Sequence, residues 1–309
     1  MENKFSTLNP DISKKWVEAV TLQGITSENY TPKIKVIEDP KQINGYSFGV
    51  LFNIYRFKRP FKEEKTKICP LCFELKESES KTYKNLCPDL TQNFLITYNA
   101  FPHLKGSSMA IAKLNKGKEK PMYHTGNLKR LEFELRELFT IADKTGFKLF
   151  HNNFGAGASI PSHEHWHLLN FGEAYDIVGK KYGFDAAQKE KLKKLKQVKT
   201  MPNFPFAHLI FNKEDSELIV HFLKKLGKKI GSNYKFGNVP HSLCQGEEGV
   251  LVVPYKKHFD RPLGSSDVAG HYLGCKTTED FEKISFKEYM SKLEEILIKK
   301  EDLNLETIL

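Results

Sequence analysis

The stretch from residue 152 to residue 167 reads NNFGAGASIPSHEHWH and decides how this chain is interpreted. It joins a loop of small residues to three histidines at alternate positions, His163, His165 and His167. Successive side chains of a β-strand point to opposite faces, so these imidazoles would share one face, about 6.6 Å apart at each step of two residues. The pattern predicts a functional site on this strand.

The loop before the histidines has the composition of an anion site. Gly155 and Gly157 lack side chains, so the backbone N–H groups beside them can approach a phosphate closely. We expect these amides and the Ser159 hydroxyl to contact the non-bridging phosphate oxygens, whose charge grows in the transition state. The loop and the strand together predict a phosphate site with a histidine at its centre.

A histidine that attacks an α-phosphorus forms a covalent nucleotidyl-imidazole, which divides one difficult transfer into two easier ones. We predict that His165 is this nucleophile, because its neighbours on both sides can orient it and neutralise the phosphate. The attacking nitrogen must be neutral, so the other ring nitrogen should donate to a group such as a backbone carbonyl. His167 is predicted to hold the phosphate or to assist the leaving group.

Two other interpretations of the triplet remain open. His-x-His on a strand is also a common zinc-binding pattern, and a histidine-rich strand can lack chemistry altogether. The regular spacing after a Gly/Ala/Ser loop favours the nucleophile over both.

The composition restricts the class of protein. The 309 residues suffice for one large or two modest domains, and 48 basic against 38 acidic residues give a net charge of +10, which suits a polyanionic partner. Five scattered cysteines do not make a disulfide framework. Neither a signal peptide nor an apolar run of the ~20 residues that span a bilayer is evident. We therefore expect a cytoplasmic protein with no membrane partner.

Two segments share one order of predicted elements. An amphipathic helix at 126–145 is followed by a strand at 148–151, the small-residue loop and the histidine strand. A helix at 216–230 is likewise followed by a strand-like stretch, a polar break and a strand at 250–255. We predict an α+β fold with two structurally related halves in one bilobed unit, of which only the first holds a complete catalytic set.

These patterns also set the predicted domain boundaries. An N-terminal extension covers 1–45, the catalytic half 46–178, a lysine-rich linker or insertion 179–203, and the second half 204–309. A terminal helix is predicted over 283–299. Neither a P-loop motif nor a dinucleotide-binding glycine fingerprint occurs, so a bound nucleotide would need another kind of site.

The triplet resembles the signature of the histidine triad superfamily, whose members transfer or hydrolyse nucleotidyl groups through the middle histidine. The surrounding sequence is similar to the branch that contains galactose-1-phosphate uridylyltransferase, diadenosine polyphosphate phosphorylases and GDP-L-galactose phosphorylase. This similarity extends over about residues 48–282. The further motifs that carry it are Asn153-x-Gly155, Gly157-Ala158-Ser159-Ile160-Pro161, Asn99-Ala100-Phe101-Pro102, Pro254-Tyr255-Lys256-Lys257-His258, Arg261-Pro262, Val268-Ala269-Gly270-His271 and Asp280-Phe281-Glu282.

The resemblance implies an antiparallel sheet of the histidine triad type with flanking helices. It also implies a nucleoside diphosphate-sugar or dinucleoside polyphosphate as substrate, with phosphate or a sugar phosphate as acceptor. Asn153, Gly155 and Gly157 would bind the substrate. A homodimer is a possible assembly.

His167 departs from this branch, whose members usually carry glutamine at that position. Histidine there is more typical of the hydrolases. The acceptor is thus phosphate or a sugar phosphate for a transferase and water for a hydrolase, while His165 remains the nucleophile in both.

Cys69 and Cys72 form a Cys-x-x-Cys pair, which can bind one tetrahedral zinc if two further ligands converge. No second such pair exists, so histidines are the obvious candidates. In uridylyltransferase-like proteins a comparable pair is completed by two histidines, and this resemblance implies His163 and His124 as ligands, with His103 as the runner-up to His124. Such a zinc would be structural. Two buried free cysteines are the alternative, and a redox pair fits the context less well.

Lys256, Lys257 and Arg261 follow an apolar strand and are predicted to clamp the phosphate of a second substrate. An exposed basic turn explains the same residues equally well. A third class of function, a zinc-stabilised nucleic-acid-binding module, is suggested by the charge and the cysteine pair. Because the chain lacks the aromatic and basic interleaving typical of single-strand binding, nucleic acid is not the expected partner.

Overall fold

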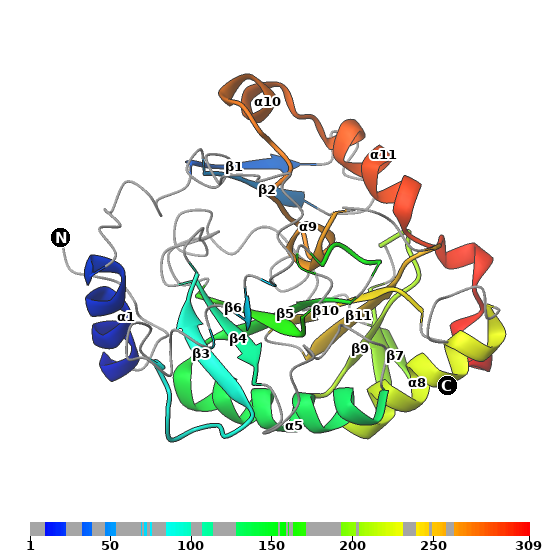
Figure 1. The fold of residues 1–309 in the computed structure, drawn as a ribbon. Helices are drawn as coiled ribbons and strands as arrows, with labels where there is room; N and C mark the ends of the chain where they lie inside the picture. The colour runs from blue at the N-terminus through cyan, green and yellow to red at the C-terminus, as the bar shows by residue number, and fades with distance from the viewer. Residues whose placement is uncertain are drawn as a thin grey trace.

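The computed structural model describes residues 10–22, 33–38, 47–53, 69, 71–72, 75, 85–99, 107–113, 128–153, 155–158, 160, 163–170, 193–201, 204–230, 239–246, 249–257 and 263–309. Figure 1 shows a large sheet with helices α5 (Leu128–Thr145) and α8 (Ser216–Lys229) on one side. A smaller sheet and the C-terminal helices lie on the other side. Helix α1 (Pro10–Leu22) lies at one end of the large sheet.

Nine strands of the described chain form the large sheet, in the order β3-β4-β6-β5-β10-β11-β9-β8-β7. Every neighbouring pair is antiparallel. The strands are β3 (Phe94–Tyr98), β4 (Ser108–Ala112), β5 (Lys148–Asn152), β6 (His165–Leu169), β7 (Lys193–Leu195), β8 (Val198–Thr200), β9 (Leu209–Phe211), β10 (His241–Gln245) and β11 (Val250–Pro254). This sheet with its helices confirms the α+β class.

The strand order is mirrored about the central pair of β5 and β10. Moving outward from β5 the sheet continues with β6, β4 and β3, and moving outward from β10 it continues with β11, β9 and β8. Helix α5 comes between β4 and β5 in the chain, and α8 comes between β9 and β10. Apart from β7, which extends the edge beyond β8, each side of the centre therefore contains two strands, a helix and two more strands in chain order.

The two long helices cover one face of the sheet with their apolar stripes. Leu131, Leu135 and Leu138 of α5 join Trp166 and Leu168 of β6 in one buried cluster. Spacings of three and four residues place those leucines on one side of the helix, which is why the sequence pattern predicted it.

Helix α5 ends where the sequence predicted. The N–H of Gly146 donates to the carbonyl oxygen of Ala142 at 2.8 Å, and Gly146 has a φ of +83°. Glycine adopts this left-handed conformation without the clash that a Cβ would cause.

The smaller sheet joins the two ends of the chain. Strand β1 (Lys33–Glu38) pairs antiparallel with β2 (Ser47–Phe52), and β2 pairs in parallel with β12 (His271–Tyr272). The ring of Phe48 stacks on that of Tyr289, with centroids 3.9 Å apart. Residues 33–38 of the predicted N-terminal extension are thus part of a sheet.

The segment predicted as a linker also contains strands. Strands β7 and β8 lie within the predicted linker 179–203 and extend the edge of the large sheet. The terminal helix predicted over 283–299 is confirmed with narrower bounds, since α11 covers Phe286–Ile296 and the short helix α10 (Thr278–Lys283) precedes it. Ser285 caps α11, its hydroxyl accepting from the N–H of Glu288. In the described part of the chain, no helix is both long and apolar enough to cross a membrane.

Candidate functional site

The histidine strand lies in the first half of the sheet, between β4 and β5. In its register His165 lies opposite Ile111 of β4, and His167 lies between Met109 of β4 and Phe150 of β5. Because Trp166 packs toward the helices, alternation places His165 and His167 on the opposite face. The strand begins only at His165, so the prediction that one strand carries all three imidazoles is wrong for His163.

His165 is held in one tautomer by its own backbone. Its Nδ1 lies 3.0 Å from the carbonyl oxygen of His163, and the side chain is almost fully buried. A carbonyl oxygen can only accept, so Nδ1 carries a proton, and in the neutral imidazole the lone pair lies on Nε2. This is the protonation state that nucleophilic attack by Nε2 requires.

His167 is the immediate neighbour of that imidazole. The two rings meet edge to face, with centroids 5.4 Å apart and an angle of 79° between their planes. His167 is only partly buried, whereas His165 is 3% exposed. The pair therefore consists of one buried, oriented imidazole and one adjacent imidazole that is more exposed.

His163 turns toward the cysteine pair. Its Nδ1 lies 3.6 Å from Sγ of Cys69 and 3.3 Å from Sγ of Cys72, and the three ligand atoms lie within 4.8 Å of one another. Its Nε2 lies 2.8 Å from the carbonyl oxygen of Ala112 and must donate to it. The Nδ1 lone pair then faces the two sulfur atoms, which is the tautomer that metal binding through Nδ1 requires.

The thiol chemistry of this cluster also suits a metal. Burial raises the pKa of Cys69, but hydrogen bonds with His163 and Cys72 outweigh burial and lower that pKa to about 7. Two sulfur donors and one imidazole nitrogen form a donor set typical of zinc. The predicted fourth ligand, His124, and its runner-up His103 lie outside the described residues.

The backbone conformation and the packing of the small-residue loop themselves require glycine. Gly155 and Gly157 have φ values of +79° and +92°. A Cβ on Gly157 would lie 3.0 Å from Cα of Gly264 in the second half. The loop therefore packs directly on the turn that contains Gly264. Ser159 of the same loop lies outside the described residues.

Asn153 contacts His241 of β10. Its N–H donates to the carbonyl oxygen of His241 at 3.1 Å, and its side-chain Nδ2 lies 3.4 Å from Nδ1 of His241. Burial lowers the pKa of His241 to about 3, so its imidazole is neutral. The structure thus places Asn153 in a buried contact between the two halves.

Asn152 is the residue that sequence reasoning missed. Together with Phe150 it occupies the alternate positions of β5 that face the same side as the histidines, toward the end of the sheet where His165 lies. Its Oδ1 accepts hydrogen bonds from the N–H of Ser265 and from Oγ of Ser242. Alternation along 148–152 would have distinguished Asn152 from Asn153.

Lys256, one of the basic residues after β11, makes a contact with α11. Lys256 donates from Nζ to the carbonyl oxygen of Glu294 at 2.6 Å, close to the end of α11. Both Lys256 and Lys257 are exposed. The hydrogen bond to Glu294 is a structural use of Lys256, since basic side chains stabilise helix C-termini. Arg261 lies outside the described residues.

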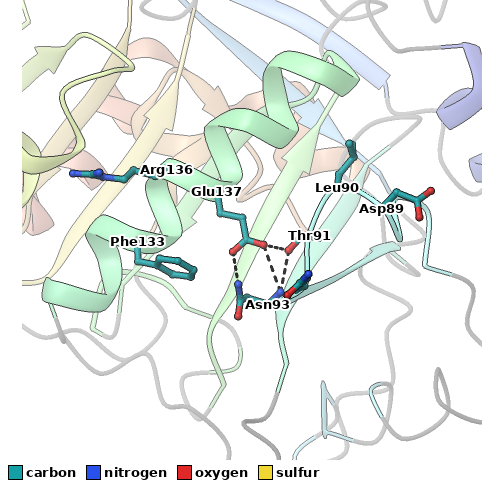
Figure 2. A pocket seen from close by; sticks show the side chains of 8 residues that line it. Asp89, Leu90, Thr91, Asn93, Phe133, Arg136 and Glu137 are labelled. Carbon is teal, nitrogen blue, oxygen red and sulfur yellow. Dashed lines mark hydrogen bonds between the residues drawn. The ribbon is translucent and has the colours of Figure 1, made fainter.

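An open surface hollow lies beside α5, on the other side of the sheet. It has a volume of about 660 Å³ and is bordered by Phe133, Arg136 and Glu137 of α5 (Figure 2). Glu137 accepts hydrogen bonds from Thr91 and from the side chain of Asn93. Since α5 covers the face opposite to His165, this hollow is separate from the histidine site.

Comparisons with known proteins agree with this geometry at the level of the fold. No protein-family model matches the sequence, and no curated protein sequence matches it. The crystal structure of yeast Ap4A phosphorylase Apa2 with Ap4A superposes with a TM-score of 0.59 at 16% identity, covering 93% of this chain and 96% of that one. The same phosphorylase with AMP gives a TM-score of 0.58 at 15% identity, covering 93% and 94%.

The chain therefore has the fold of a diadenosine tetraphosphate phosphorylase. Diadenosine polyphosphate phosphorylases are among the proteins that the sequence motifs resemble, so the motifs and the comparison agree on the fold.

Proposed function

We propose that this chain is a nucleotidyltransferase of the phosphorylase type that acts on a dinucleoside polyphosphate or a nucleoside diphosphate-sugar. The observation that carries the proposal is the hydrogen bond from Nδ1 of His165 to the His163 carbonyl, because it selects the tautomer in which a neutral imidazole would attack through Nε2. The fold shared with Ap4A phosphorylase supports a nucleotide as substrate.

The proposed reaction has two displacements at one phosphorus atom. Nε2 of His165 attacks the α-phosphorus, the bond from phosphorus to the leaving oxygen breaks, and a nucleotidyl-histidine forms. The positive charge that develops on the imidazole is stabilised by the hydrogen bond to the His163 carbonyl. An acceptor phosphate then attacks the same phosphorus, releases a nucleoside diphosphate and restores the imidazole.

The mirrored strand order supports two related half-domains, of which the first alone carries the chemistry. Strand β11 occupies the place in the second half that β6 occupies in the first. Its Leu251 and Val253 belong to an apolar cluster on the face where β6 presents imidazoles. The second half would then act as a support, and its Gly264 turn would hold the loop that precedes the histidines.

We also propose that Cys69, Cys72 and His163 bind a structural zinc ion, with His124 as the fourth ligand. The grouping of three ligand atoms and the tautomer of His163 support this. The same His163 supplies the carbonyl oxygen that orients His165, so a bound zinc would fix the residue that positions the nucleophile.

A nucleotidyl hydrolase is the second candidate, and the contact between His167 and His165 favours it. A titratable ring in that place can activate water as a general base. Product analysis with and without orthophosphate separates the two: a phosphorylase gives a nucleoside diphosphate and a hydrolase gives a monophosphate. If a hydrolase is correct, the His167→Gln variant should shift the products toward the diphosphate.

The test of the proposal is trapping of the intermediate. Incubation with diadenosine tetraphosphate labelled at the α-phosphorus should leave an acid-labile label on the protein, and His165→Asn should abolish it. His221→Asn, on the exposed side of α8, is the matched control and should be labelled like the wild type. Absence of both label and turnover across a panel of dinucleoside polyphosphates and nucleotide sugars would refute an enzyme of this class.

A further inference from the structure

One buried side chain contacts both neighbours of His165 from the reverse face of the sheet. Nε2 of His151 lies 2.7 Å from Oε1 of Glu164, and its ring stacks on Trp166 with centroids 4.2 Å apart and an interplanar angle of 18°. All three side chains are buried. We propose that His151 is a positioning residue for His165, an inference that rests on the function proposed above.

The link from His151 to the nucleophile runs through one peptide group. Glu164 shares a peptide bond with His163, and the carbonyl of that peptide accepts the Nδ1 proton of His165 at 3.0 Å. When His151 holds the Glu164 side chain, rotation of this peptide group is restricted. The His163 carbonyl, which selects the tautomer of His165, is then fixed in direction. The carbonyl of Glu164 is itself held, since it accepts from the N–H of Ala112 at 3.1 Å.

Trp166 secures the other side of His165. Its ring is 1% exposed and lies against the ring of His151 in the cluster beneath α5. The two residues that flank the nucleophile thus share one anchor, which is itself fixed in the middle of β5 opposite Leu243. A shift of His151 would move both flanking residues together.

The buried pair of His151 and Glu164 is not explained by core packing alone. A carboxylate and an imidazole are expensive to bury, and an apolar pair of similar volume would pack as well or better. A role in orienting the adjacent strand gives a reason for such a pair directly behind the proposed nucleophile. Because His151 lies on the reverse face from His165, it touches no reacting atom and acts only through Glu164 and Trp166.

The decisive variant removes the polar contact without leaving a buried charge. His151→Phe alone keeps an aromatic ring against Trp166 but removes the hydrogen-bond partner of the buried Glu164 carboxylate. We therefore expect this single variant to be strongly destabilised. The double variant H151F/E164L replaces both members by apolar side chains and should keep a melting temperature close to that of the wild type. Glu164→Gln is the matched control, because its amide oxygen still accepts from His151.

Two measurements on these proteins test the positioning role. The ¹⁵N NMR spectrum of the imidazoles, with His165→Asn identifying the His165 signals, should show a single Nδ1–H tautomer in the wild type and in Glu164→Gln. The double variant should show a mixture of tautomers. Its kcat with diadenosine tetraphosphate should fall by about 10- to 100-fold, with KM changed less than about threefold, because a misdirected nucleophile slows chemistry rather than binding.

A folded double variant with the wild-type kcat, or with an unchanged His165 tautomer, overturns the proposal. The NMR measurement needs no turnover, so it tests the positioning role of His151 separately from the proposed nucleotidyltransferase function. If the wild type forms no nucleotidyl label the proposed function fails, while the spectrum still decides whether His151 positions His165.

Discussion

Strands β6 and β11 occupy corresponding places in the mirrored sheet but differ in what they present. On the face away from α5 and α8, β6 carries His165 and His167, whereas β11 carries Leu251 and Val253. The aliphatic residues belong to the same buried cluster as Tyr289 of α11. The same backbone arrangement thus presents imidazoles on one strand and aliphatic side chains that pack in the core on the other.

The second half contacts the loop before the histidines, although this face of β11 carries no imidazole. Its turn at Leu263 and Gly264 packs on Gly157, and its Ser265 donates a backbone hydrogen bond to Asn152. Tyr255 donates from its hydroxyl to the carbonyl oxygen of Leu263 at 2.8 Å and so holds the turn. The loop that precedes the histidines therefore depends on contacts from both halves.

The largest expected effects are a loss of turnover for a variant of β6 and a loss of stability for a variant of β11. His165→Asn should lower turnover by at least about 1,000-fold, since the nucleophile itself is gone, while the melting temperature changes little. Leu251→Ala should instead lower the free energy of unfolding by about 2–5 kcal/mol through a core cavity. Steady-state kinetics and urea unfolding of both variants measure this. Loss of turnover in folded Leu251→Ala would show that β11 also takes part in the chemistry.

Removal of a zinc ligand should have the next largest effect. Cys72→Ser should abolish bound zinc and lower kcat by about tenfold, because the support of His163 is lost. Cys87→Ser is the matched control, since burial raises the pKa of Cys87 to about 11 and the thiol stays protonated. Metal analysis of the purified proteins checks the prediction. A wild type without zinc, or equal zinc in wild type and Cys72→Ser, would refute the zinc site.

A smaller effect is expected from the buried carboxyl behind the histidine strand. Burial, and then the charge of Glu164, raise the pKa of Glu134 from its usual 4.5 to about 8 despite the ion pair with Arg130. The folded state therefore favours the protonated form of Glu134. Its contribution to the free energy of unfolding is complete below about pH 4.5 and is lost as the pH rises to about 8, because the unfolded chain releases this proton at a lower pH than the folded one does.

Glu134→Gln should therefore flatten the fall of stability between pH 5 and 8, by an amount on the order of a few kcal/mol. Urea unfolding at several pH values measures this. The control is Glu132→Gln, on the outer side of the same helix, which should keep the wild-type slope. Equal slopes for wild type and Glu134→Gln would show that Glu134 is ionised in the fold.

Much of the site was predictable because it depends on local pattern. The alternation around His165 and Trp166 identified the strand and its two faces, and the leucine spacing identified α5. The pairing of His163 with Cys69 and Cys72 came from resemblance, and the structure brings those three side chains together. Asn152 was missed because the face of a residue beside a loop depends on where the strand ends.

Other features could not be predicted, because they depend on contacts between distant segments. The hydrogen bond from Lys256 to Glu294 requires the position of α11, which no local pattern defines. The parallel pairing of Tyr272 with Val50 joins segments near opposite ends of the chain.

The sequence by itself determined the identity of the chemical groups, the periods of the long helices and the faces of the histidine strand, because these depend on residues a few positions apart. Only the tertiary structure decided that His151 contacts both Glu164 and Trp166, and that the second half supports the loop at Gly157. Those contacts arise when strands pair and faces pack. Their partners are then selected by shape and by hydrogen bonding across the whole fold, and not by spacing along the chain.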